Sequence, residues 1–322
     1  MINVFRINVP DETLDRIRTR VAEYPWHEMP DDGGWAYGTN LDYMKELCAY
    51  WVNEFDWRKH EARINRFPHY TAEVDGIDLH FIHEKGSGPA SMPLIISHGW
   101  PGSVVEFLDI IEPLAHPERF GGSADDAFEV IAPSLPGFGF SGRPPRPIGP
   151  RKMAGMFDTL MTDVLGYDSY LAQGGDWGGA ISSWLGYDHA PTCRAIHINI
   201  MTMRHADGPK GPEEEAWAVE FEREQMMEDG YRTQQATKPQ TLSYAMMDSP
   251  VGVAAWIIEK FNSWSDTDGD NIESVHSKDS LLTNIMVYLV TGTFNSASWI
   301  YYGRREEGGR LLSPEGRRVE VP

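Results

Sequence analysis

The sequence has few of the features that place a chain in a membrane or in an oxidising compartment. Only two cysteines, Cys48 and Cys193, occur among 322 residues. Two cysteines cannot build a disulfide framework and suit a reducing compartment. No run of about 18 apolar residues is present, so no transmembrane segment is predicted. The first residues also lack the basic and apolar regions of a signal peptide, and together these absences predict a cytoplasmic protein.

Positive charge is scarce as well. The chain has 28 Lys and Arg against 48 Asp and Glu, which gives a formal net charge of −20. A protein with this excess of negative charge repels nucleic acids and anionic membranes, so neither is expected as a partner. The hydrophobic content of 41% is that of a globular chain with a sizeable core.

The hydrophobic pattern changes period along the chain. Helical spacing interrupted by Pro, Gly and Trp predicts that residues 1–68 form an N-terminal helical meander packed on a larger body. Over 69–200, short strand-like runs alternate with helices, beginning with a hairpin whose turn is Asp75-Gly76. Two of these helices are expected over about 104–114 and 152–165. This alternation predicts an α/β fold: a mostly parallel sheet, built from βαβ units and flanked by helices.

The alternation stops after the strand that ends near residue 199. Residues 201–303 contain helix-like stretches and no convincing strand, which predicts a helical lid inserted into the α/β core. The expected lid helices are at about 213–229, 239–248, 250–262 and 279–291. Residues 304–322 are expected to begin the return to the core, because Arg317–Pro322 look like the start of a further strand.

A glycine-rich turn links one strand to the next helix, in Leu171-Ala-Gln-Gly-Gly-Asp176-Trp-Gly-Gly-Ala180. Gly174 and Gly178 flank Asp176 at two residues on each side, the pattern of the nucleophile elbow of α/β-hydrolases. An aspartate at this position can attack an alkyl carbon and leave an ester on the enzyme. An Asp that only caps the helix is the alternative.

A second turn, His98-Gly99-Trp100-Pro101, follows another apolar run. A turn of this kind can aim the backbone N–H of Trp100 at a developing oxyanion, with the N–H of Trp177 as the second donor. His98 itself is expected to hold the turn by hydrogen bonds rather than to act in catalysis.

These turns, together with Leu135-Pro-Gly-Phe-Gly-Phe-Ser141, resemble those of the epoxide hydrolases of the α/β-hydrolase superfamily. More narrowly, the chain resembles the microsomal-type branch, which includes the juvenile-hormone epoxide hydrolases and many bacterial members. The resemblance covers essentially the whole chain. Further matches lie in the N-terminal region and the lid: Phe55-Asp-Trp-Arg58, Asn65-x-Phe-Pro-His69, Ser249-Pro-Val-Gly252, Glu259-Lys-Phe261 and Leu282-Thr-Asn284 followed by Thr291-Gly-Thr293.

The resemblance implies hydrolysis of small apolar epoxides to vicinal diols without a cofactor or a metal. Asp176 would be the nucleophile, and the lid tyrosines Tyr231 and Tyr301 would donate protons to the epoxide oxygen. A phenol with a pKa near 10 is protonated at neutral pH and suits that role. Tyr302 is adjacent to Tyr301, and either lid tyrosine taken alone could be a packing residue.

The resemblance also implies an acid and a histidine that activate water in the second step, both after the last strands of the sheet. The chain ends at Pro322 before either position, and no histidine downstream of Asp176 lies on such a turn; these are His189, His197, His205 and His276. The expectation is therefore a hydrolase lacking its C-terminal end. The alternatives are a haloalkane or haloacid dehalogenase, which needs halide-binding groups in the lid, and a binding protein without turnover. The oligomeric state and the physiological epoxide are not predicted.

Overall fold

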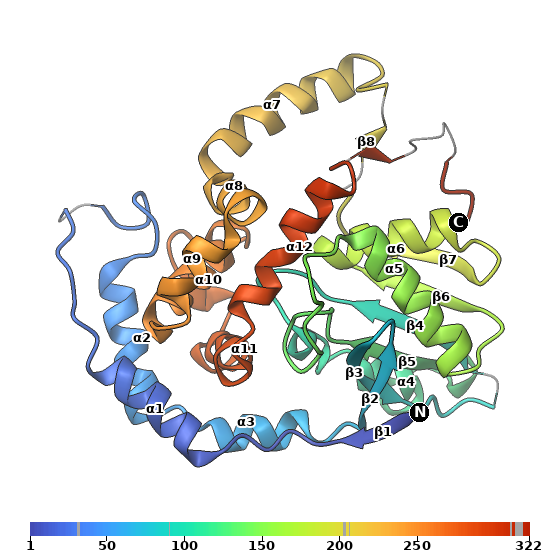
Figure 1. Ribbon diagram of the computed structural model, residues 1–322, viewed down its shortest axis with the longest axis horizontal. Coiled ribbons are helices and arrows are strands. Elements are labelled where there is room, and N and C mark those ends of the chain that lie inside the picture. The colour runs from blue at the N-terminus through green and yellow to red at the C-terminus, as the bar shows by residue number, and fades with distance from the viewer. Residues whose placement is uncertain (31–32, 90, 202–203, 206, 310, 313–317) are drawn as a thin grey trace.

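The computed structural model is built on a seven-stranded sheet, which lies to one side of the molecule in Figure 1. The structure describes residues 1–30, 33–89, 91–201, 204–205, 207–309, 311–312 and 318–322. The strand order is β1-β2-β3-β5-β4-β6-β7. The pairs β5–β4, β4–β6 and β6–β7 are parallel, whereas β1, β2 and β3 join the sheet through antiparallel pairs. The strands are β1 (Ile2–Phe5), β2 (His69–Val74), β3 (Ile77–Glu84), β4 (Met92–Ser97), β5 (Phe128–Pro133), β6 (Tyr170–Gly174) and β7 (Cys193–Ile198).

The sheet has the α/β architecture that the sequence predicted. Helices α5 (Pro150–Thr159) and α6 (Asp176–Asp188) cover one face of its parallel half (Figure 1). The predicted hairpin is also confirmed, since β2 pairs antiparallel with β3. Both turn residues, Asp75 and Gly76, have the positive φ angles that a tight hairpin turn requires, 51° and 75°.

Several elements differ from the prediction. The single helix expected over 104–114 is broken into a 3-10 turn, η1 (Val104–Phe107), and a short α4 (Ile111–Ala115). Pro113 accounts for the break, because proline has no N–H and its ring clashes with the carbonyl four residues earlier. The helix expected over about 152–165 is α5 followed by a π turn at Leu160–Val164. Strand β1 was not anticipated.

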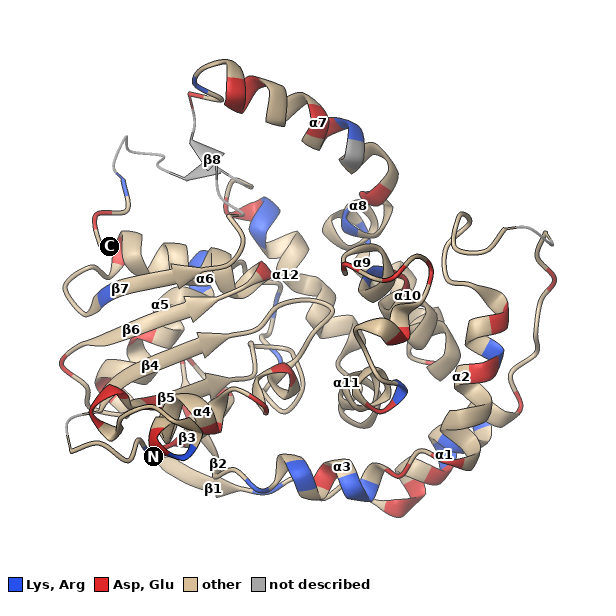
Figure 2. Cartoon of the chain, turned by 180° about the vertical axis from the view of Figure 1, so that it is seen from behind, with Lys and Arg blue, Asp and Glu red and all other residues tan. Residues whose placement is uncertain are grey.

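The lid consists of helices that lie beyond the carboxyl ends of the parallel strands, toward which the arrowheads of β4, β6 and β7 point in Figure 2. Two of them, α8 and α12, were not predicted. A two-residue strand, β8 (Arg204–His205), pairs with β9 (Leu311–Leu312) and corrects the expectation of no strand in this region. The lid helices are α7 (Pro212–Glu228), α8 (Gly230–Thr237), α9 (Pro239–Met246), α10 (Pro250–Ser263), α11 (Lys278–Thr291) and α12 (Phe294–Glu306).

The N-terminal segment connects the sheet to the lid. It adds β1 to the edge of the sheet and then forms α1 (Asp11–Ala22), α2 (Leu41–Asn53) and α3 (Trp57–Ile64). The side chain of Thr39 donates to the backbone of Ala255 in α10 (2.6 Å), and the Tyr50 hydroxyl donates to Asp279 in α11 (2.8 Å). The segment therefore holds the lid as well as the core, and the domain boundaries drawn from the sequence stay a prediction.

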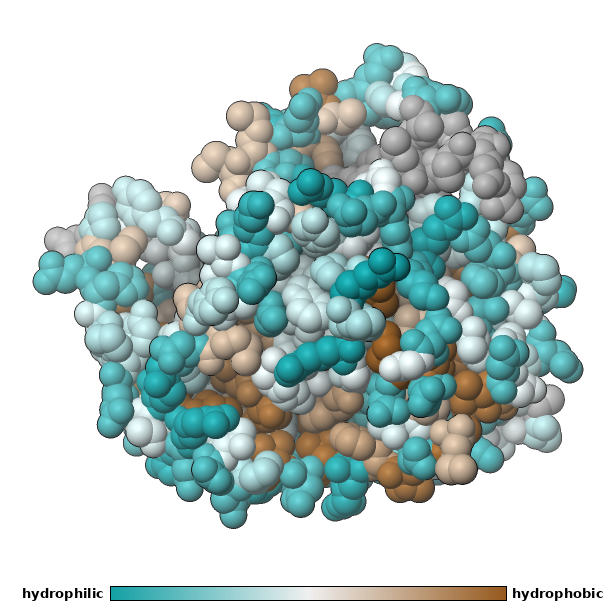
Figure 3. All heavy atoms as spheres, in the orientation of Figure 1, coloured by the Kyte–Doolittle hydropathy of each residue, from teal (hydrophilic) through white to brown (hydrophobic). Residues whose placement is uncertain are grey.

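The end of the chain does not form the predicted strand in its described part. Arg317 lies outside the described residues, and residues 318–322 contribute one backbone hydrogen bond to β7, from Ile196 N–H to the carbonyl of Pro322 (2.9 Å). Much of the face in Figure 3 is hydrophilic, with apolar residues between the polar ones. Within the described ranges, no helix is both long and apolar enough to cross a membrane. The cytoplasmic location stays a prediction.

Candidate active site

Asp176 is the first residue of α6 and sits on a sharp turn directly after β6. Its φ angle is 47°, in the left-handed region that non-glycine residues rarely adopt. A Cβ atom added to Gly174 would lie 2.1 Å from the backbone of Gly178, and one added to Gly178 would lie 1.8 Å from the carbonyl oxygen of Ser97. Only glycine fits at these two positions, so the small residues around Asp176 are a steric requirement of the elbow.

Backbone groups from two turns, the turn after β4 and the elbow itself, surround the Asp176 carboxylate. The backbone N–H of Trp100 donates to Asp176 Oδ1 at 2.7 Å, and the backbone N–H of Trp177 lies close enough to this carboxylate to lower its pKa. Burial raises the pKa of Asp176 from 3.8 to about 6, against the opposing effect of both N–H groups and of Arg304. At neutral pH the group is therefore mainly the carboxylate, which is the form that can attack a carbon atom.

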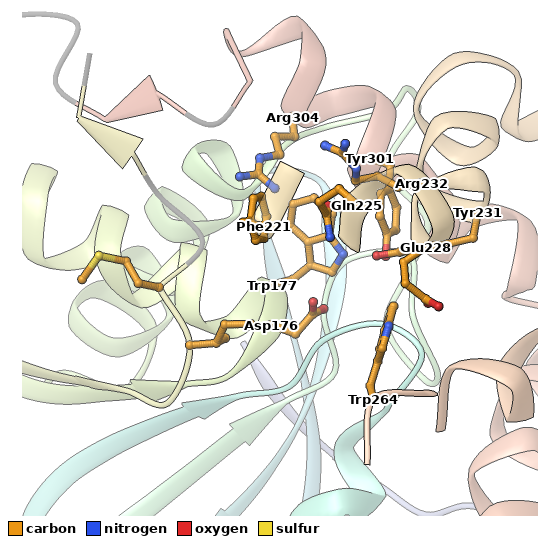
Figure 4. A pocket seen from close by; sticks show the side chains of 12 residues that line it. Asp176, Trp177, Phe221, Gln225, Glu228, Tyr231, Arg232, Trp264, Tyr301 and Arg304 are labelled. Carbon is orange, nitrogen blue, oxygen red and sulfur yellow. The ribbon is translucent and has the colours of Figure 1, made fainter. Parts of the chain in front are cut away.

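An aromatic pocket of about 250 Å³ opens above Asp176 (Figure 4). Tyr231 from α8 and Tyr301 from α12 both line it, and Tyr301 is buried with 4% of its surface exposed. The ring of Tyr231 stacks on Trp100, with centroids 5.0 Å apart, and the ring of Tyr301 meets Trp177 edge-on at 4.7 Å. The structure thus brings all five residues of the predicted site together, whereas Tyr302 does not line the pocket.

Three buried hydrogen-bond donors lie in or next to this pocket with few acceptors around them. The hydroxyl of Tyr301 and the indole N–H groups of Trp100 and Trp177 make no hydrogen bond of regular geometry to the residues that the structure describes, although the Tyr301 hydroxyl lies close enough to the side chains of Tyr231 and Trp177 for both to affect its pKa. Burial raises the pKa of Tyr231 and of Tyr301, so both phenols keep their protons. Because unsatisfied buried donors are unfavourable, the arrangement suits a ligand that brings an oxygen or an anion into the pocket.

His98 and His189 do not line this pocket and have hydrogen-bond partners of their own. His98 is buried, with Nδ1 3.1 Å from the carbonyl of Gly99 and Nε2 accepting from the N–H of Leu135 (3.2 Å). Burial lowers the pKa of His98 to about 4, in agreement with the expectation that it holds the turn as a neutral ring. His189 pairs with Asp158 (3.0 Å) at the far end of α6 from Asp176. In the part of the chain that the structure describes, no group of His, Cys, Asp or Glu could hold a metal ion.

A second cavity, of about 550 Å³, borders Asp176 and brings residues to the site that sequence reasoning missed. Glu106, Asn199 and His276 line it together with the nucleophile. Desolvation and the Asp176 carboxylate raise the pKa of Glu106, although the residue itself is exposed to solvent, which moderates this shift. His276 lies in the region expected to form the lid, and its Nε2 is 2.8 Å from the Ser265 hydroxyl. The one signal for Glu106 in the sequence is an acid within the apolar run after the Trp100 turn.

Comparison with known proteins places this site in a family. A family model described as the epoxide hydrolase N terminus matches residues 2–107, and one described as the alpha/beta hydrolase fold matches residues 92–270. Epoxide hydrolase 1 of Sus scrofa is 34% identical, over 100% of this chain and 76% of its own length. The chain belongs to the microsomal-type epoxide hydrolase family.

Solved structures agree with this membership. The crystal structure of juvenile hormone epoxide hydrolase from the silkworm Bombyx mori matches with a TM-score of 0.84 and 30% identity, covering 100% of this chain and 79% of its own. The structure of Aspergillus niger epoxide hydrolase matches with a TM-score of 0.81 and 30% identity, covering 94% and 78%. The α/β-hydrolase fold and the resemblance to this branch of the epoxide hydrolases, both predicted from sequence motifs, are confirmed.

Proposed function

We propose that the chain opens small apolar epoxides and hydrolyses them to vicinal diols through a covalent hydroxyalkyl ester on Asp176. The observation that carries the proposal is the arrangement across the pocket. A carboxylate anchored by the Trp100 N–H shares one cavity with the two phenols of Tyr231 and Tyr301. Nucleophile and proton donors therefore meet any epoxide that enters the pocket.

In ring opening, Asp176 is the nucleophile and a tyrosine is the proton donor. The hydrogen bond from Trp100 engages Oδ1, which leaves Oδ2 of Asp176 for the attack on an oxirane carbon. The new C–O bond forms as the ring C–O bond breaks, and the ring oxygen takes a proton from a phenol of Tyr231 or Tyr301. The apolar walls, including Trp177 and Trp264, fit the hydrocarbon part of the substrate.

Hydrolysis of the ester completes the reaction. Water adds to the ester carbonyl carbon, and the negative charge develops on Oδ1, to which the Trp100 N–H donates, with the Trp177 N–H close to the same carboxyl group. The intermediate then collapses by breaking the bond between the carbonyl carbon and the substrate oxygen, which takes the proton of the added hydroxyl and leaves as the diol. The phenolate regains its proton from the attacking water. The acid and histidine that the family resemblance implies for this step are not assigned to any described residue.

Intact-mass measurement after treatment with an apolar epoxide such as styrene oxide tests the proposal. The wild-type chain should gain the mass of one epoxide at Asp176 or release the diol, and Asp176→Asn should do neither. A folded wild-type sample that forms neither adduct nor diol would contradict the proposal. A chloroalkane of similar size serves as the second arm: release of halide at a comparable rate would favour the dehalogenase alternative.

A further inference from the structure

Lys260 is a buried cation in the lid, close to the candidate active site. It lies on α10 with 5% of its surface exposed, and it lines the second cavity together with Asp176. Its Nζ donates to Glu228 Oε2 at 2.8 Å and to Glu259 Oε1 at 3.1 Å. These ion pairs make the buried charge tolerable, since an unpaired ammonium in this position would be strongly unfavourable.

The same ammonium lies against two aromatic rings. Nζ of Lys260 is 5.1 Å from the ring centroid of Tyr231 and 5.5 Å from that of Trp264. A cation at such a distance is attracted by the electrons of the ring. Because the ring of Tyr231 also stacks on Trp100, with only 8° between the planes, the phenol is held by an indole and by an ammonium at once.

Ring opening moves negative charge toward this ammonium. When Asp176 forms the ester it loses its charge, and when a phenol gives its proton to the ring oxygen it keeps the electron pair of the O–H bond. If Tyr231 is that phenol, one unit of negative charge passes from Asp176 to Tyr231, next to Lys260. The negative charges of Glu228 and Glu259 act against the attraction between the ammonium and the phenolate. Because their side chains are 36% and 27% exposed, water screens these charges more than it screens the buried ammonium.

We propose that Lys260 is a positioning residue for ring opening, which fixes the ring of Tyr231 and stabilises the charge that its phenol oxygen gains. The inference rests on the proposed function, because it concerns the proton donor of that reaction. This role of Lys260 differs from a purely structural role in one respect. Its effect on the rate must depend on the hydroxyl of Tyr231, since without that hydroxyl no charge develops beside the ammonium.

A double-mutant cycle separates the two roles. Lys260→Met is combined with Tyr231→Phe, which keeps the aromatic ring and removes the hydroxyl group. The rate of adduct formation on Asp176 is measured in single turnover with styrene oxide, by rapid quench and intact mass. Lys260→Met should slow adduct formation about tenfold when Tyr231 is present, and it should have no further effect in the Tyr231→Phe background. Lys260→Arg keeps a cation near the rings and should restore most of the rate.

Lys278 offers a matched control outside the site. Its Nζ also donates to two carboxylates, Glu46 (2.8 Å) and Glu273 (2.7 Å), and lies 5.9 Å from the ring of Tyr50. It lines neither cavity that borders Asp176. Lys278→Met removes the same kind of cation and should lower the thermal midpoint without changing the rate of adduct formation.

The outcomes are distinct. The inference would be wrong if Lys260→Met slowed adduct formation equally with Tyr231 and with Phe at that position, or did not slow it at all. It would also be wrong if a folded Lys260→Arg variant did not restore the rate. In each case the proposed function would still stand. A wild-type chain that forms neither adduct nor diol would overturn the proposed function and the inference with it.

Discussion

Replacing Gly99 by alanine should disable the nucleophile, although the change adds a single methyl group. The new Cβ atom would lie 2.2 Å from Oδ1 of Asp176, 2.4 Å from its Cβ and 2.6 Å from its Cγ. Non-bonded carbon atoms need about 3.5 Å, so the carboxylate must move by about 1 Å. A displacement of this size costs about a hundredfold in rate, and losing the hydrogen bond from Trp100 would add to the loss.

The assay is the single-turnover rate of adduct formation on Asp176, followed by intact mass. Gly155→Ala is the matched control, because the nearest atom to its added Cβ is Nε2 of His189 at 4.0 Å. Gly155 lies within α5, so this control should retain the rate and stabilise the fold by about 0.5–1 kcal/mol. If Gly99→Ala formed the adduct at the wild-type rate, the placement of the Asp176 carboxylate against this turn would be wrong.

Three further predictions concern the nucleophile and the proton donors. Tyr231→Phe and Tyr301→Phe should each slow ring opening by about a hundredfold while the protein stays folded; an unchanged single-turnover rate would remove that tyrosine from the reaction. The rate of ring opening should fall as the pH drops through about 6, because burial raises the pKa of Asp176 to about 6 and protonation removes the nucleophile; a pH profile that falls only near pH 4 would contradict this shift. Asp176→Asn should stabilise the fold at pH 8 by up to ~3 kcal/mol, since the pKa of the folded carboxyl lies above its ordinary value of 3.8 and the charged form is therefore disfavoured by folding. That gain should be lost in urea unfolding at pH 3, below both pKa values, where both states bind the proton, and a gain of equal size at pH 3 would point to relief of backbone strain instead.

The parallel half of the fold could be predicted because the residues that form each unit are neighbours in the sequence. Each strand and its following helix lie close together in the sequence, and the right-handed crossover leaves little choice of topology. Strand β1 could not be found in this way, since its four residues are largely exposed and pair with β2, more than sixty residues later. Helix α12 was missed for another reason: it is buried on several sides, so it lacks the polar stripe by which periodicity reveals a helix.

The same distinction between local sequence patterns and long-range contacts holds for the candidate site. Asp176 and the N–H of Trp100 could be predicted, because sharp turns need glycines at fixed spacing and leave a pattern in the sequence. The importance of Glu106 and Lys260 depends on surroundings that exist only when the lid meets the core. A lysine in an amphipathic helix is ordinarily a solvated residue, and nothing in the sequence around residue 260 indicates that its ammonium contacts the ring of Tyr231.

The hydrogen bond from Trp100 to Oδ1 gives the two oxygens of Asp176 different roles in both steps. Oδ1 is engaged before any substrate arrives, so the attack falls to Oδ2, and Oδ1 becomes the carbonyl oxygen of the ester. When water adds to that ester, the charge develops on Oδ1, to which the Trp100 N–H already donates. The left-handed backbone at Asp176 and the raised pKa of its carboxyl are unfavourable for folding, and both follow from placing one carboxylate where two backbone N–H groups and two phenols can reach it.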